Sequence, residues 1–279
     1  MLARLPIPAG PARHEIVLSY LTRLTVLHGL PEGELFEHVS VSAITTENRP
    51  GRKPGRVVLA DRLALAAGRP VEHLVLALPE LRDPAPDWTA WRHQSQTGCP
   101  RCDARHDGGP VRRLLPHHHY VCTRHRYWIG PPDAGQLPTP LHDQVGDQIV
   151  AAQYRHNGLL ARHGAAGVFD AVLTGFLICG HLWKHGQREE TAAVHQWEQR
   201  AQRLIPPGSA ITTYSTSLLF AAVYPEAISL AELIASPPWR QLAHGDTAQQ
   251  RVFLTEACRR LGRIVPTLTT SVPTRSGTG

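Results

Sequence analysis

The spacing of apolar residues predicts helices in both halves of the chain. Between residues 14 and 28 the apolar side chains recur at intervals of three and four, which places them on one face of a helix. Gly29 follows at the position where a left-handed residue ends many helices. A second, shorter helix is expected after Pro31, where Leu35, Phe36 and Val39 supply the apolar positions.

A more compact pattern follows a basic loop at residues 48–55, whose sequence is NRPGRKPG. Asp61 is a candidate N-cap for a short helix that ends at Gly68. Pro70 then begins another short helix. Two short helices joined by a glycine-containing turn are the outline of a helix-turn-helix, although plain helical bundles contain the same outline.

The chain after residue 140 has a helical pattern almost to its end. The predicted helices cover residues 141–160, 167–184, 189–204, 209–223, 230–235 and 247–261. Residues 167–184 are apolar on nearly every side, so we expect this helix to lie at the centre of a bundle. Residues 137–140 have the composition of a linker.

Four potential metal ligands lie in a segment that has little hydrophobic periodicity. Cys99 and Cys102 have CxxC spacing, and after nineteen residues Cys122 and His125 have the matching CxxH spacing. Two such knuckles converge on one tetrahedral ion, and thiolate and imidazole donors favour Zn²⁺. Four protein ligands leave no position for a water molecule. The sequence therefore predicts a structural zinc site that holds this polar segment together.

Other interpretations of these ligands stay open. His117–His119 precede Cys122 and offer imidazoles in place of His125, although spacing favours His125. The CxxC pair also occurs as a redox motif, which has no need of a second knuckle. A fortuitous cluster of cysteines is the remaining alternative.

These patterns together predict a mainly α fold in three parts and a tail. Residues 1–90 form an N-terminal helical part that resembles a helix-turn-helix protein, and residues 91–136 form an inserted module similar to a zinc ribbon. Residues 137–263 form a C-terminal helical bundle. Residues 264–279, rich in Ser, Thr, Pro and Gly, are predicted to be disordered.

Charge adds a nucleic-acid partner to this picture. The net charge is +6, and only two of the 29 basic residues are lysines, so guanidinium groups suited to bidentate phosphate contact dominate. A codon bias towards arginine, and compensation of three zinc-bound thiolates, also explain part of this excess. The predicted nucleic-acid-binding residues are Arg49, Arg52, Lys53, Arg56, Arg62, Arg69, Arg112, Arg113, Arg124 and Arg126.

The sequence has few features of an enzyme. It has no Walker A loop, no GxGxxG motif and no GxSxG elbow, and its acidic residues are scattered. His181 and His185 are one helical turn apart, but Leu182 stands where a metalloprotease carries glutamate, so we interpret this pair as structural. We therefore expect a non-enzymatic protein. A zinc-dependent hydrolase or nuclease that uses the histidines is an alternative.

We expect a cytoplasmic protein that is not attached to a membrane. Residues 1–13 contain no continuous apolar stretch, so no signal peptide is predicted. Arg, Asp, Gly and His interrupt the later apolar segments, and we expect none of them to span a bilayer. Five cysteines are too few and too irregular for a secreted disulfide scaffold, whereas metal binding suits a reducing compartment.

Three stretches of the chain resemble motifs of one protein family. Pro6–Pro8, followed by Glu15 and by SYLTRL at residues 19–24, is similar to an opening "P…E…SyLxRL" pattern. The cysteine and histidine knuckles of residues 99–125 resemble a zinc finger of the same family, and residues 224–226, Tyr-Pro-Glu, resemble a motif in its helical C-terminal part. In these features the chain resembles the TniQ family, the target-selection proteins of certain transposons.

The resemblance implies a protein that binds DNA or a DNA-targeting complex and recruits an AAA+ ATPase, which passes the site to a transposase. It implies zinc binding at the four matched residues. Many relatives have a second set of zinc knuckles, and the remaining cysteines of this chain, Cys179 and Cys258, stand alone. Our primary hypothesis is thus a zinc-stabilised adaptor between DNA and a protein partner. A stand-alone helix-turn-helix transcription regulator is the second hypothesis.

Overall fold

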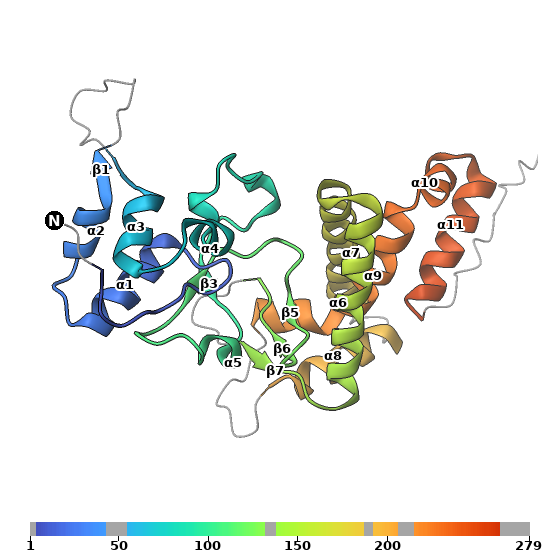
Figure 1. Ribbon diagram of the computed structural model, residues 1–279. Helices are drawn as coiled ribbons and strands as arrows, with labels where there is room; N and C mark the ends of the chain where they lie inside the picture. Colours follow the sequence, from blue (N-terminus) through green and yellow to red (C-terminus); the bar gives the residue numbers. More distant parts are fainter. Residues whose placement is uncertain (1–3, 43–54, 132–137, 187–191, 206–214, 263–279) are drawn as a thin grey trace, which may run out of the picture.

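The computed structural model describes residues 4–42, 55–131, 138–186, 192–205 and 215–262 and is mainly helical, as the sequence predicts (Figure 1). Short helices and a two-stranded sheet make up the N-terminal part, residues 4–90. Small strands surround one short helix in the cysteine module, residues 91–140. Long helices make up the C-terminal bundle, residues 141–262, at the opposite side of the molecule from the N-terminal part (Figure 1). The predicted tail, 264–279, lies outside the described residues.

The N-terminal part consists of small elements around one hydrophobic core. Tyr20, Leu24 and Leu63 are among its fully buried side chains. Its elements are α1 (Val17–His28), α2 (Glu34–Val39), β1 (Ser40–Ser42), β2 (Arg56–Val58), α3 (Ala60–Ala67), α4 (Val71–Ala77) and the 3-10 helix η1 (Pro79–Leu81). β1 and β2 are antiparallel, with Ser40 opposite Val58.

Glycine ends two of these helices as predicted, but one predicted cap is wrong. Gly29 and Gly68 both have a φ of 61° and stand directly after α1 and α3. Asp61 is not an N-cap, because α3 begins one residue earlier and Leu59 occupies the capping position. The backbone N–H of Leu63 bonds to the carbonyl of Leu59 and so closes the first turn without a side-chain cap.

A buried ion pair joins the start of α1 to the cysteine module. Glu15 and Arg23 have side chains that are 0% and 1% exposed, and the Arg23 Nε lies 2.8 Å from a Glu15 oxygen. Glu15 also accepts hydrogen bonds from the backbone N–H of Ala12 and the hydroxyl of Ser19. Arg23 donates to the carbonyl of Asp107, in the loop that follows the first knuckle. Ser19 and Arg23 of the SYLTRL motif are therefore buried parts of the fold, whereas Thr22 is exposed.

The cysteine module is built from paired strands too short to form a core of their own. Its elements are η2 (Trp88–Ala90) at the boundary, β3 (Gln96–Thr97), α5 (Pro100–Asp103), β4 (Arg112–Arg113), β5 (Val121–Cys122), β6 (Tyr127–Trp128) and β7 (Thr139–Pro140). β3 pairs with β4, and β5, β6 and β7 form an antiparallel sheet. The interpretation of 137–140 as a linker is wrong for Thr139 and Pro140, because β7 pairs with β6.

Trp128 attaches this module to the bundle. Its side chain is 1% exposed, and its Nε1 donates a 2.9 Å hydrogen bond to the hydroxyl of Ser217.

We expect Trp128→Phe to lower the free energy of unfolding by about 2 kcal/mol, because it removes both that bond and part of a buried ring. Urea unfolding measures the change. Trp88→Phe is the control, since Trp88 is 38% exposed, and an equal loss in both variants would contradict the prediction.

The bundle is built around one helix that the sequence analysis did not identify as central. Its helices are α6 (Asp143–His163), α7 (Ala165–Gly186), α8 (Ala192–Arg203), α9 (Thr216–Ala235), α10 (Pro237–His244) and α11 (Thr247–Arg260). α9 packs against the other five, whereas much of α7 faces outward. The expectation that residues 167–184 form the central helix is therefore wrong.

α9 also joins two predicted helices, 209–223 and 230–235, and contains Pro225 between them. Proline has no N–H and normally disrupts a helix interior. Here the guanidinium of Arg200 donates to the carbonyl of Ala222, and Arg155 donates to the carbonyl of Pro225 at 3.1 Å. Arg200 also forms an ion pair of 2.7 Å with Glu226. Side chains from neighbouring helices thus satisfy backbone carbonyls around the proline, and the helix continues through it.

Two helices, α7 and α9, have the length and mean hydropathy of a membrane span, contrary to the expectation that charged and small residues exclude one. In α9 two thirds of the apolar window, 67%, is buried in the bundle, as in the core helix of a water-soluble domain. In α7 the buried share is 33%. Length and composition alone are weak grounds for a membrane location, and the absence of membrane contact stays a prediction.

Candidate metal centre

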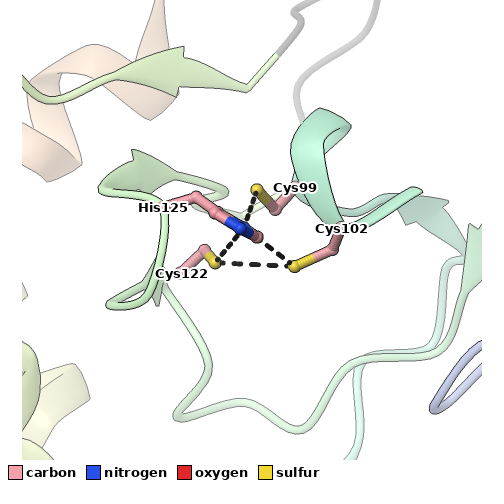
Figure 2. Close-up of side chains that lie close together, drawn as sticks. All are labelled: Cys99, Cys102, Cys122 and His125. Carbon is pink, nitrogen blue, oxygen red and sulfur yellow. Dashed lines mark hydrogen bonds between the residues drawn. The ribbon is translucent and has the colours of Figure 1, made fainter. Parts of the chain in front are cut away.

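The two predicted knuckles meet at one point in the structure. Cys99, Cys102, Cys122 and His125 place their ligand atoms within 4.8 Å of one another and can together hold a metal ion. Figure 2 shows the four side chains pointing toward a common centre, two from each knuckle. The imidazole contributes its Nδ1 atom, which lies 3.2 Å from the sulfur of Cys102 and 3.5 Å from that of Cys99.

Local backbone structure positions each pair of ligands. Cys99 is the N-cap of α5, and Pro100, which follows it, begins the helix with a favourable φ. The N–H of Cys102 bonds to the carbonyl of Cys99 at 2.9 Å, which turns both sulfurs toward the same side. Cys122 lies at the end of β5 and His125 in the turn to β6, where Arg126 adopts a left-handed φ of 56°.

The site is partly shielded by a small apolar cluster. Leu115 and Ile129 are buried against Cys99 and Cys122. Burial raises the pKa of the thiols of Cys99 and Cys122, so the uncharged thiol is favoured while no cation is bound. A bound metal ion reverses this preference, since it stabilises thiolates. The cluster therefore has the chemistry of a metal site.

The alternative imidazoles lie elsewhere. His119 is half-buried, and its carbonyl accepts a hydrogen bond from Arg92. His117 and His118 line a separate cavity next to α6 and α7. Among the described residues, the group of potential ligands contains His125 and none of these three histidines. The choice of His125 from spacing is thus in agreement with the geometry.

Positive charge gathers around the ligands. Desolvation lowers the pKa of the His125 imidazole most, and the positive charges of Arg124, Arg105 and Arg101 lower it further. All three side chains are exposed. In the described part of the chain, no hydrogen bond or ion pair holds any of these guanidinium groups. The sequence analysis left Arg101 and Arg105 out of the predicted interface; their positions, within three residues of Cys102, were the available signal.

The other predicted basic residues have different surroundings. Arg113 is buried and forms an ion pair with Asp103, so its guanidinium serves the fold. Arg126 is exposed and lies 2.6 Å from Asp147 of α6, and Arg112 is exposed with a bond to the carbonyl of Ser95. Arg49, Arg52 and Lys53 lie outside the described residues.

In the N-terminal part, the structure describes three of the predicted DNA-binding residues, and the fold partly engages the guanidinium group of each. Arg56 of β2 donates to the hydroxyl of Ser40, and Arg62 of α3 lies 3.5 Å from the carbonyl of His38. Arg69 is half-buried, and its Nε is buried with no hydrogen-bond partner among the described residues. These side chains form a dispersed basic surface.

The helix-turn-helix outline is present, but its second helix is poorly suited to reading DNA. α3 and α4 pack together around the turn at Gly68. The exposed side chains of α4 are Glu72, His73 and Leu76. A recognition helix normally presents Arg, Lys, Asn or Gln to base edges and phosphates. The exposed face of α4 carries none of these and includes an acid.

The pair of histidines on α7 has no third ligand nearby in the part of the chain that the structure describes. The rings of His181 and His185 lie 4.4 Å apart, and both are exposed. No other His, Cys, Asp or Glu completes a metal cluster with them within the described residues.

Comparisons with known proteins identify no relative: no family model, no curated protein and no solved structure matches the chain. The arrangement of the chain's own residues therefore carries the argument for its function.

Proposed function

We propose that the four-ligand cluster binds one structural Zn²⁺. A tetrahedral site with Zn–S bonds of about 2.3 Å and a Zn–N bond of about 2.0 Å has edges of about 3.8 Å between sulfurs and about 3.5 Å between sulfur and nitrogen. The sulfurs of Cys102 and Cys122 lie 3.8 Å apart, and His125 Nδ1 lies 3.2, 3.5 and 3.8 Å from the three sulfurs. Three thiolates and one imidazole suit zinc better than magnesium or calcium, which prefer oxygen ligands.

A structural role for the ion follows from its surroundings. Four protein ligands complete a tetrahedral sphere and leave no position for an activated water, which a zinc hydrolase requires. The segments that supply the ligands contact both the N-terminal part, through Arg23 and Asp107, and the bundle, through Trp128 and Ser217. The ion thus holds the junction between the two larger parts.

The protein acts, in this proposal, as a non-enzymatic adaptor that binds DNA through the surface around the zinc site. The observation that carries it is the set of three exposed guanidinium groups without hydrogen-bond partners among the described residues, Arg101, Arg105 and Arg124. One of their charges offsets the net −1 of zinc with three thiolates, and two remain for phosphates. Rigid attachment to a metal site fixes their positions, which reduces the entropy lost on binding.

The bundle supplies the surface for a protein partner. Leu173 and Leu177 of α7 are 43% and 64% exposed, and together with Phe169 they leave an apolar face on the outside of the molecule. The likeness of the N-terminal, zinc and Tyr-Pro-Glu motifs to the TniQ family supports a partner of the kind that this family engages, an AAA+ ATPase and through it a transposase. The acidic, arginine-free face of α4 makes sequence-specific regulation by a helix-turn-helix the weaker candidate.

Salt-dependent DNA binding tests this function. We expect the triple variant R101A/R105A/R124A to bind duplex DNA more weakly than the unaltered protein. We also expect its plot of log affinity against log salt to be less steep by about 2–3, since each lost phosphate contact contributes about 0.9. Fluorescence anisotropy with a labelled duplex between low and physiological salt measures both quantities.

A matched control removes the same charge elsewhere. R203A/R240A/R251A replaces three exposed arginines of the bundle, on α8, α10 and α11, and is expected to leave the salt dependence unchanged. Equal slopes for the two triple variants would reject the surface around the zinc site as the DNA contact.

A further inference from the structure

A second site lies between the cysteine module and the bundle. A cavity of about 400 Å³ opens there, bordered by the segment His117–Tyr120 on one side and by α6, α7 and α9 on the other. This volume is within the range of small-molecule sites, about 300–1,000 Å³. The cavity shares no residue with the metal centre, whereas Phe169 and Leu173 of the apolar face proposed for a protein partner also line it.

Two imidazoles in the cavity wall have ring nitrogens without a hydrogen-bond partner among the described residues. His117 and His118 are half-buried, and in the described part of the chain no hydrogen bond reaches their ring nitrogens. Burial, aided by the charge of Arg92, lowers the pKa of both side chains. Each ring is therefore neutral at physiological pH and presents one donor and one acceptor.

Aromatic rings form much of the remaining wall. The ring of His117 lies 4.5 Å from that of Phe169, and Phe176 lies 4.6 Å from Phe220 and 5.7 Å from Tyr120. Walls of this kind favour a flat ring, which can stack on or meet their edges. The imidazoles add polar contacts at the rim of such a ring.

Charge restricts the ligand further. Among the described residues that line the cavity, the only acidic or basic side chains besides the imidazoles are those of Asp87 and Asp170, and both are exposed. Hydrogen bonds from Thr89 lower the pKa of Asp87, which keeps that group negative. An anionic group bound beside these carboxylates would be repelled, so the ligand is uncharged or cationic where it meets them.

We propose that this cavity binds a nucleobase, the uncharged heteroaromatic ring of a nucleoside. The aromatic walls stack on the base, and His117 and His118 bond to its edge. The nucleobase can enter the cavity as part of a free nucleoside or as an unpaired base of a DNA strand. The carboxylates favour the free nucleoside, since they oppose a nearby phosphate.

Titration of the zinc-loaded full chain with adenosine, guanosine, cytidine and thymidine tests the site. Isothermal calorimetry is expected to show binding of at least one nucleoside, and weaker binding of its 5′-monophosphate. L173W, which places a large ring in the cavity wall, should weaken binding at least about tenfold, a change of about 1.4 kcal/mol. L177W lies about one turn farther along α7, does not line the cavity, and should bind as the unaltered protein does.

Histidine variants and oligonucleotides complete the test. H117F and H118F keep a flat ring but remove its nitrogens, and we expect each to weaken binding while melting temperatures stay unchanged. A single-stranded oligonucleotide, compared with the same strand carrying one abasic site, reports whether a strand delivers the base. If the abasic strand binds more weakly to the unaltered protein, and L173W removes this difference, the strand is the source of the base.

The proposal is overturned if no nucleoside binds and the abasic site has no effect, or if L173W and L177W behave alike. Failure of the R101A/R105A/R124A test would leave these results unaffected, because none of those arginines lines the cavity.

Discussion

Cys102→Ser is expected to release the metal and destabilise the cysteine module. The thiolate is one of four ligands, and in zinc fingers the binding free energy, about 10–16 kcal/mol, is also the folding free energy of the module. Loss of even a third of it lowers stability by about 4 kcal/mol, a large share of the 5–15 kcal/mol typical of a protein. Atomic emission spectroscopy should find close to one zinc per unaltered chain and almost none in the variant.

Two control variants separate metal loss from the loss of a thiol. Cys258→Ser removes a half-buried cysteine of α11 that is outside the ligand cluster, and it should retain the zinc and the stability of the unaltered protein. His125→Ala should lose zinc, whereas His117→Ala should keep it. A stoichiometric zinc content in both Cys102→Ser and His125→Ala would mean that the ion is held elsewhere or that the cluster holds none.

Arg23→Met is expected to be the most damaging substitution outside the metal site. It leaves the carboxylate of Glu15 buried without its cation, and breaking a buried ion pair in this way costs about 3–5 kcal/mol. It also removes the hydrogen bond to the carbonyl of Asp107, so the contact between α1 and the cysteine module weakens. Urea unfolding followed by circular dichroism measures the change.

The double variant E15L/R23M tests whether the unpaired charge is the cause. It leaves no charge in the site and should be more stable than Arg23→Met alone. Arg259→Met breaks an exposed pair with Glu256 on α11 and should leave the unfolding midpoint within experimental error, because Arg259 is 71% exposed. If the double variant is less stable than Arg23→Met, the loss of stability comes mainly from the lost hydrogen bonds of Glu15 and not from its unpaired charge.

The metal ligands could be predicted because their chemistry is local. CxxC and CxxH spacing turns two donors toward one side of a short stretch of chain, whatever the rest of the fold does. The glycines that end α1 and α3 were predictable for the same reason, since a left-handed φ is required at one position and glycine supplies it. Helical spacing of apolar residues likewise predicted most helices and the mainly α class.

The surroundings of the predicted DNA-binding residues could be foreseen only in part. Composition and clustering pointed to arginines, but not to which of them the fold itself would use. Arg113 and Arg124 look alike in the sequence, and the structure buries one against Asp103 and leaves the other exposed beside the metal site. Arg23 was read as part of a motif, and its burial with Glu15 depends on how the N-terminal segment folds back.

The sequence by itself thus determined the candidate ligand set, the helix ends at glycine and the helical class, because each depends on residues within a few positions of one another. Only the tertiary structure decided that α9 is the central helix and continues through Pro225, since distant arginines, Arg155 and Arg200, bond to its carbonyls. It also brought His117 and Phe169 together in the wall of a cavity. Contacts between residues far apart in the chain follow from packing, and no local spacing encodes them.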